Sequence, residues 1–208
     1  MSFRLIYEGE LLSSNASCKT AVRRNKHAIR RQLHPQLKRL WETEKTLRYY
    51  AFGPIVGKSY RSDEPPPPKD EGLQYIAVKY SRGGFGFVPT IGVGHPGQED
   101  PNDICSLDIL FLRREPPGRI VQGGDIDNRI KTLFDGLRLP QNGDDVTDPP
   151  EEHEKPMYCL LRDDQLISDV RVNTDLLLRP PKGTAKHKLN EVLLVIEVKI
   201  RPTSALWL

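Results

Sequence analysis

The stretch that decides the fold of this chain reads GDIDNRIKTLFDGL, residues 124–137. Helical spacing from Asp127 places one set of apolar residues on a single face: Ile126, Ile130, Leu133, Phe134 and Leu137. The same spacing places Asp127, Lys131 and Asp135 at successive turns of another face. We therefore expect a helix over residues 127–139 that lies on a β-sheet, with Asp125 just before its first turn and directed toward the polar face.

The segments on either side supply the sheet. Apolar patterning predicts strands at residues 3–12, 73–80, 105–113, 165–178 and 190–201. Residues 24–48 have helical periodicity, and Pro35 within them predicts a kink or two helices. The order β-α-β-β-α-β-β predicts a small α+β (mixed α/β) domain in which helices pack on one mixed sheet.

Three segments do not fit this frame. Residues 53–72 contain four successive prolines and are expected to form an extended loop. Residues 83–97 are rich in Gly and Pro and are interpreted as an insertion or a hairpin. Residues 140–156 are acidic and rich in Pro, and their length predicts a functional or a disordered loop.

Composition limits the class of protein. A chain of 208 residues is enough for one domain, here residues 1–208 with insertions near 53–104 and 140–162. No apolar run is long enough to cross a membrane, and the N-terminus lacks the pattern of a signal peptide. Cys18, Cys105 and Cys159 are scattered, which favours free thiols in a reducing cytoplasm and gives no zinc-binding spacing.

Charge is distributed unevenly along the chain. Residues 19–48 hold ten Lys and Arg against two acids, whereas residues 99–175 hold eighteen acids against nine bases. A basic segment beside an acidic centre suits a protein that attracts a polyanion and acts on it with bound cations. On charge alone, a solvated basic helix beside a solvated acidic loop is the favoured interpretation.

The paired carboxylates have two interpretations. Asp127 suits the N-terminus of a helix, where it accepts backbone N–H bonds and meets the helix dipole. Asp125 and Asp127 together also suit Mg²⁺, which prefers a few carboxylate oxygens completed by water and phosphate. Asp163 and Asp164, at the start of the strand predicted for residues 165–178, are the expected source of a third carboxylate. The spacing from Asp125 excludes an EF-hand, and no phosphate-binding loop is present.

These residues resemble a known family. Asp125-Ile126-Asp127-Asn128, with Lys131 and Asp135, is similar to the first acidic motif of the RusA family of Holliday-junction resolvases. Asp163-Asp164-Gln165-Leu166-Ile167 resembles that family's second acidic motif, and Ser13-Ser14-Asn15 is a loose echo of its first turn. The two acidic motifs cover about thirty residues.

The resemblance implies a homodimeric, Mg²⁺-dependent endonuclease (Mn²⁺ as a substitute) that nicks four-way DNA junctions and needs no small-molecule cofactor. It implies Asp125, Asp127 and Asp164 as metal ligands and catalytic residues and Lys131 as the basic residue essential to catalysis, with supporting roles for Asn128, Asp135 and Asp163. The segment from Asp135 to Asp163 is longer than in the family, so Asp144-Asp145 is a rival source of the third carboxylate.

A basic cluster accompanies the acidic motifs, and branched DNA is the expected partner. The residues expected to contact it are Arg23, Arg24, Lys26, Arg30 and Arg31. The alternative functions are a non-catalytic junction-binding accessory protein that retains the fold, and a structural protein whose acids cap helices and solvate a loop.

Overall fold

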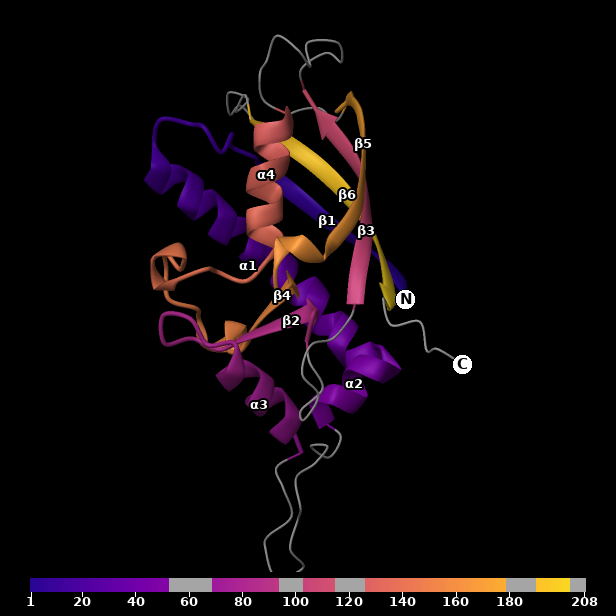
Figure 1. The fold of residues 1–208 in the computed structure, drawn as a ribbon. Helices are drawn as coiled ribbons and strands as arrows, with labels where there is room; N and C mark the ends of the chain where they lie inside the picture. The colour runs from indigo at the N-terminus through magenta and orange to yellow at the C-terminus, as the bar shows by residue number, and fades with distance from the viewer. Residues whose placement is uncertain (53–68, 94–102, 115–125, 179–189, 203–208) are drawn as a thin grey trace, which may run out of the picture.

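The computed structural model describes residues 1–52, 69–93, 103–114, 126–178 and 190–202 and has a mixed α+β fold (Figure 1). The predicted fold class is therefore confirmed. The helices are α1 (Lys19–Thr43), α2 (Lys45–Phe52), α3 (Glu71–Lys79) and α4 (Ile126–Leu137). The strands are β1 (Ser2–Glu10), β2 (Phe87–Ile91), β3 (Asp103–Arg113), β4 (Met157–Leu161), β5 (Ile167–Leu176) and β6 (Glu191–Pro202).

The strands form two sheets rather than the single sheet expected. The larger sheet has the order β1-β6-β3-β5, in which β6 is antiparallel to both of its neighbours and β3 is parallel to β5. The smaller sheet is a parallel pair of β2 and β4. Strand β4 escaped prediction because all five of its residues are buried, so its sequence, MYCLL, has no polar alternation.

Helices α1 and α4 lie side by side over one face of the larger sheet (Figure 1). Buried residues of α1 at helical spacing face the core: Ile29, Leu33, Leu37 and Trp41. Helix α4 meets α1 at Gly136, where a Cβ would lie 2.9 Å from the Cβ of Ile29. The absence of a side chain at Gly136 therefore sets how closely the two helices approach.

The helical region of residues 24–48 does not divide where Pro35 predicted. Helix α1 continues through Pro35, which is exposed and so loses its backbone hydrogen bond on the solvent side. The break comes at Glu44, whose carboxylate accepts hydrogen bonds from the backbone N–H groups of Thr46 at 2.6 Å and Leu47 at 3.2 Å. This side-chain cap starts α2.

The strand predicted for residues 73–80 is wrong, because this segment forms α3. Leu73, Ile76, Ala77 and Tyr80 face the core at intervals of three and four residues, which is helical spacing. Val78 lies on the opposite side and is 78% exposed. A period of 3.6 rather than 2.0 fits all five positions.

The remaining loops are only partly described. Residues 53–68 and 94–102 lie outside the described residues, so the extended loop predicted for residues 53–72 is tested only at its end, where α3 begins at Glu71. Within the segment read as a hairpin, Arg82 and Phe85 exchange backbone hydrogen bonds around Gly83 and Gly84, both with positive φ. The acidic loop of residues 140–156 contains two 3-10 turns, Gly143–Asp145 and Glu152–Glu154.

Candidate functional site

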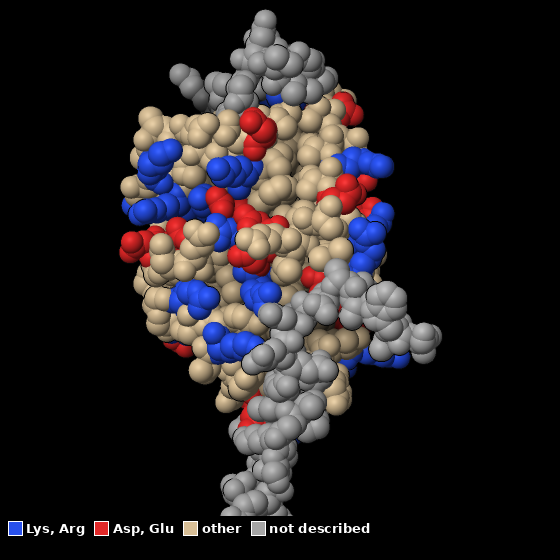
Figure 2. All heavy atoms as spheres, viewed as in Figure 1, with Lys and Arg blue, Asp and Glu red and all other residues tan. Residues whose placement is uncertain are grey.

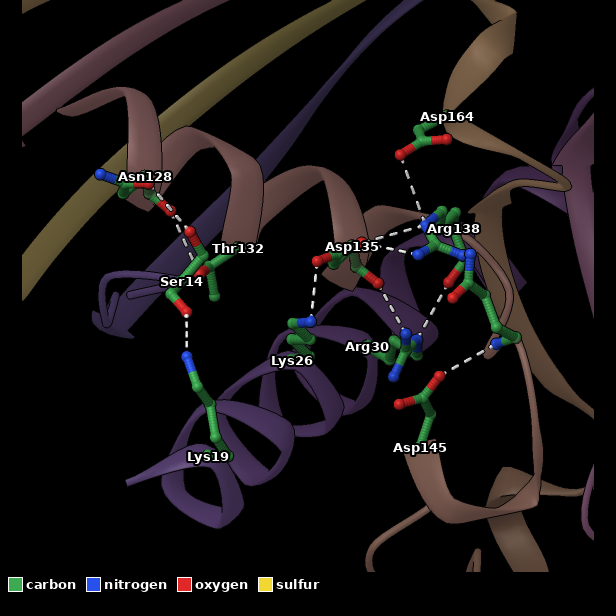
Figure 3. Close-up of polar contacts among 11 residues, drawn as sticks. Ser14, Lys19, Lys26, Arg30, Asn128, Thr132, Asp135, Arg138, Asp145 and Asp164 are labelled. Carbon is green, nitrogen blue, oxygen red and sulfur yellow. Dashed lines mark hydrogen bonds and ion pairs between the residues drawn. The ribbon is translucent and has the colours of Figure 1, made fainter. Parts of the chain in front are cut away.

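The first turn of α4 is tied to the turn that follows β1. Asn128 Oδ1 accepts a hydrogen bond from Ser14 Oγ at 3.1 Å (Figure 3) and another from Asn15 Nδ2 at 3.0 Å. The backbone N–H of Ser14 also donates to the carbonyl oxygen of Asn128 at 3.1 Å. These contacts give Asn128 and the segment Ser13-Ser14-Asn15 a common role, because together they fix the orientation of the helix start that carries Asp127.

Asp127 and Lys131 are the accessible residues of the predicted polar face. Both are exposed, and neither forms an ion pair with another residue in the described ranges. The i, i+4 pairing of Lys131 with Asp127 or Asp135 is therefore not formed. A carboxylate and an ammonium group one turn apart on α4 remain available to a ligand.

Asp135, the third member of that face, is held by basic residues. Its Oδ2 lies 2.7 Å from Lys26 Nζ, and its Oδ1 lies 2.7 Å from Arg138 Nη2 and 3.1 Å from Arg138 Nε (Figure 3). Burial alone would raise the pKa of Asp135, but hydrogen bonds and charge from Lys26 and Arg138 outweigh it and hold the pKa below its usual value. Asp135 is thus an ionised structural link between α1 and α4.

Arg30 of α1 also contacts the end of α4. Its side chain is 3% exposed, and it donates from Nη2 to the carbonyl oxygen of Asp135 at 2.6 Å and from Nε to that of Arg138 at 3.0 Å. The last carbonyl groups of a helix lack intrahelical partners, and a cation there also meets the negative end of the helix dipole. Arg30 therefore caps the C-terminal end of α4.

The two acids of the second acidic motif, Asp163 and Asp164, have different contacts. Asp163 accepts a hydrogen bond from the backbone N–H of Gln165 at 2.9 Å and so caps the 3-10 turn Asp164–Leu166. Asp164 directs its carboxylate toward Arg138, with Oδ2 at 3.5 Å from Nε (Figure 3). Its side chain is 44% exposed, whereas that of Arg138 is 11% exposed. Arg138 was not singled out from the sequence, although its position three residues after Asp135 is one at which helical side chains meet.

The expected metal ligands are only partly brought together. Asp125 lies outside the described residues, so the centre of Asp125, Asp127 and Asp164 stays a prediction. Asp164 contacts Arg138, which also binds Asp135. Asp135 is about 12 Å further along the axis of α4 than Asp127, since eight residues rise about 1.5 Å each. Within the described ranges, no group of three or more His, Cys, Asp or Glu could hold a metal ion. Asp127 with water and phosphate oxygens still suits Mg²⁺, which takes few protein ligands.

The rival pair lies on the other side of Arg138. Asp145 accepts a hydrogen bond from the backbone N–H of Gln141 at 3.1 Å, and Asp144 is exposed on the same 3-10 turn. Figure 3 places Asp145 below Arg30 and away from the helix start that carries Asn128. Neither Asp144 nor Asp145 belongs to a group of three or more described His, Cys, Asp or Glu residues that could hold a metal ion.

The basic residues expected to bind DNA have different environments. Arg23 and Arg24 are exposed on α1. Lys26 is bound to Asp135, and Arg31 donates from Nε to Glu154 Oε1 at 2.9 Å. Arg30 is buried in the contacts described above, so it has no surface to offer to a phosphate. The sequence did not separate these roles because the acidic partners come from segments more than 100 residues away.

On the face that carries α1 and α4, basic side chains lie on both sides of a central group of acidic residues (Figure 2). No described helix is long and apolar enough to cross a membrane. No protein-family model, curated protein or solved structure matches this chain.

Proposed function

We propose that this protein is a Mg²⁺-dependent endonuclease that nicks branched DNA, with the four-way junction as its substrate. The observation that carries the proposal is that Asp127 and Lys131 are exposed and form no ion pair with another described residue. Both are exposed one turn apart at the start of a helix whose other polar residues are bound to partners. A carboxylate that only capped a helix would not need an unpaired lysine on the same face.

The chemistry follows from these two side chains. Asp127, with Asp125 preceding it in sequence, would hold Mg²⁺, which lowers the pKa of bound water and stabilises negative charge on a phosphodiester. Lys131 is placed to neutralise charge on a phosphate oxygen bound beside Asp127. Asn128 keeps the first turn of α4 fixed against the turn after β1, so the carboxylate and the ammonium group hold their relative positions.

The surface around these residues suits a polyanion. Arg23 and Arg24 are exposed on the neighbouring helix α1, and the preceding Lys19 donates to the carbonyl oxygen of Ser14 at 3.2 Å. The positively charged start of α1 therefore lies against the turn that holds α4. Contacts of this kind neutralise backbone phosphates without reading base sequence, which fits recognition by shape.

A homodimer is part of the proposal, and the outer face of the larger sheet is its proposed interface. Ile6, Val195 and Leu110 occupy one row across three strands, and Ile6 and Leu110 are 52% and 39% exposed. Two residues along the strands from this row, a second row has Arg4 on edge strand β1 and Arg171 on edge strand β5. Two residues in the opposite direction, a third row has Asp175 on β5. A two-fold axis along the apolar row would place Asp175 over Arg171 of a second copy.

The test is nicking of a synthetic four-way junction with Mg²⁺ or Mn²⁺. Asp127→Asn is expected to abolish nicking and to keep junction binding, and Lys131→Ala is expected to lower the rate at least about a hundredfold. Glu42→Gln and Arg39→Ala on α1 are matched controls, since both residues are exposed and follow, by nine or more residues, the α1 residues Lys26 and Arg30 that contact α4. Full activity of Asp127→Asn, or a wild-type protein inactive on junctions, flaps and forks, would remove the proposal.

The second candidate is a non-catalytic junction-binding protein. It is favoured by one observation: the carboxylate of Asp164 contacts Arg138 instead of lying near Asp127. Calorimetry separates the candidates, because the accessory protein would bind a junction tightly and take up neither Mg²⁺ nor Mn²⁺.

A further inference from the structure

The exposed aromatic side chains of the described residues gather on two short helices. Tyr49 and Phe52 on α2 are 52% and 51% exposed, and Tyr75 on α3 is 42% exposed. Every other Phe, Tyr or Trp in the described ranges is at least partly buried. Burial of an aromatic ring is strongly favourable, so three half-exposed rings on neighbouring helices indicate a surface that a ligand covers.

One side of α2 combines these rings with cations. Its exposed residues stand three, four and seven positions after the first of them, and they are Lys45, Arg48, Tyr49 and Phe52. The opposite side of the helix is buried at Leu47 and Ala51. Neither Lys45 nor Arg48 forms an ion pair with another described residue. The outward side of α2 therefore presents two positive charges among two aromatic rings.

Helix α3 continues this surface. A Cβ at Gly72 would overlap the carbonyl oxygen of Tyr50, so the start of α3 is packed against the end of α2. Tyr75 and Lys79 follow Gly72 by three and seven residues, share its side of α3 and are exposed. The exposed residues of the two helices together form what we call the α2–α3 face: Lys45, Arg48, Tyr49, Phe52, Tyr75 and Lys79.

An unpaired DNA strand offers both kinds of group that this face can bind. Its bases stack on aromatic rings, and its phosphates attract Lys and Arg. The bases of a duplex are already stacked on one another, so a duplex offers the phosphates alone. A protein partner fits less well, because protein interfaces are depleted of lysine. We propose that the α2–α3 face binds an unpaired DNA strand, with bases stacked on its three rings and phosphates beside its three cations.

The inference rests on the proposed function for its choice of DNA, and it deepens that function by specifying branched DNA that carries an unpaired strand, such as a flap. Helices α2 and α3 lie beyond the C-terminal end of α4, whereas Asp127 and Lys131 lie in its first half (Figure 1). A strand on the α2–α3 face would hold the substrate without touching the reacting phosphate.

Fluorescence anisotropy with EDTA present measures strand binding without nicking. The probe is a labelled oligothymidine of about 16 nucleotides, and a duplex of the same length is the comparison. Phe52→Leu keeps apolar surface but removes the ring, so it should weaken oligothymidine binding at least about fivefold and leave duplex binding unchanged. Tyr49→Phe keeps a ring and should stay within about twofold of wild type. Thr46→Ala, exposed on the same helix but outside the face, is the control.

The cations are tested by the salt dependence of the same binding. Arg48→Gln should reduce the slope of log affinity against log salt by about 0.7, because one contact with a single-strand phosphate is lost. Tyr49→Ala combined with Phe52→Leu should weaken oligothymidine binding further than either change alone. Both positions are exposed, so circular dichroism of the variants should match wild type.

The outcomes separate this inference from the nuclease beneath it. If the ring-free variants bind oligothymidine as tightly as wild type, the inference is overturned whatever the nicking assay shows. If they bind it normally but sediment with a smaller mass than wild type, the face joins two copies of the chain and the inference is again overturned. Wild-type protein that binds oligothymidine through these rings but nicks no branched DNA would remove the nuclease and leave the strand-binding face. Tighter binding of a flap than of a fully paired junction, lost in Phe52→Leu, supports the inference.

Discussion

The ammonium group of Lys26 lies 2.7 Å from Oδ2 of Asp135, so the N-terminal third of α1 is bound to the last turn of α4. The side chains are 21% and 13% exposed, which shields the pair from solvent. Arg138 occupies the other oxygen of the same carboxylate. Asp135, to which the resemblance gives a supporting role, therefore joins the two helices, and basic side chains hold both of its carboxylate oxygens.

Asp135→Asn should lower the free energy of unfolding by about 1–3 kcal/mol at pH 7, because Lys26 and Arg138 keep their charges without a counter-charge. The pKa of Asp135 is held below its unfolded value, so its contribution is present above about pH 4 and is lost as the pH falls through the lower folded value. Urea denaturation between pH 7 and pH 2 should show that the free energy of unfolding falls less steeply with pH in Asp135→Asn than in wild type. Equal slopes for Asp135→Asn and the control Glu42→Gln, an exposed position on α1, would contradict this assignment.

Gly136→Ala should destabilise the contact between α1 and α4. The added Cβ would lie 2.9 Å from the Cβ and Cγ2 of Ile29 and 3.0 Å from its Cδ1. Overpacking of this kind costs about 1–3 kcal/mol, whereas replacing a helical glycine by alanine gains about 1 kcal/mol. Thermal denaturation should therefore show a small net loss for Gly136→Ala. Ile29→Ala combined with Gly136→Ala should lose less than the sum of the single losses, and strict additivity would remove the steric explanation.

Asn128→Ala should lower the nicking rate through the orientation of α4. The substitution removes the acceptor of Ser14 Oγ and Asn15 Nδ2, so the first turn that carries Asp127 loses two of its anchors. We expect a fall in kcat of at least about tenfold, because a small displacement of a catalytic group from the reacting atoms lowers the reaction rate strongly. Junction affinity in a gel-shift assay should change little. Ser14→Ala, which removes one anchor, should give an intermediate rate, and a wild-type rate in Asn128→Ala would show that the turn has no catalytic role.

Junction binding should depend on Arg23 and Arg24 and not on Arg31. The first two are exposed, whereas Arg31 is bound to Glu154, which is 5% exposed. Replacing both Arg23 and Arg24 by Ala should reduce the slope of log affinity against log salt by about two. Arg39→Ala on the same helix is the matched control. An unchanged salt slope in the double variant would place the DNA surface elsewhere.

Local patterns in the sequence were enough to predict α4, β1, β3 and β6, because each has a clear period and ends near Gly, Pro or Asn. They could not predict β4, whose residues are uniformly apolar, and α3 was mistaken for a strand over a segment of only eight residues. At the candidate site, spacing alone placed Asp127 and Lys131 on one polar face of α4, where both are exposed. Arg138 was not singled out, and Arg30 was assigned to DNA contact rather than to the end of α4, because their roles depend on contacts that only the tertiary fold creates.

His34 should make the protein less stable as the pH falls from 7 to 5. Its Nδ1 accepts a hydrogen bond from the backbone N–H of Tyr158 at 3.0 Å, which requires a neutral ring at that nitrogen. Burial, and then the nearby Lys38, lower the pKa of His34 below 6.5. A group with a lowered folded pKa contributes stability above its unfolded pKa and loses it as the pH falls toward the folded value. The loss is up to about 1.4 kcal/mol per pH unit for one histidine.

Urea denaturation at pH 7.5 and pH 5.5 measures this directly. His34→Gln should be less stable than wild type at pH 7.5, and the difference between the two pH values should shrink. It should not vanish, because burial also lowers the pKa of His27, which is 1% exposed. The double variant His27→Gln with His34→Gln should therefore show the flattest dependence of the three proteins. If wild type were equally stable at both pH values, neither histidine could be buried as a neutral ring, and the packing of α1 against β4 would have to be different.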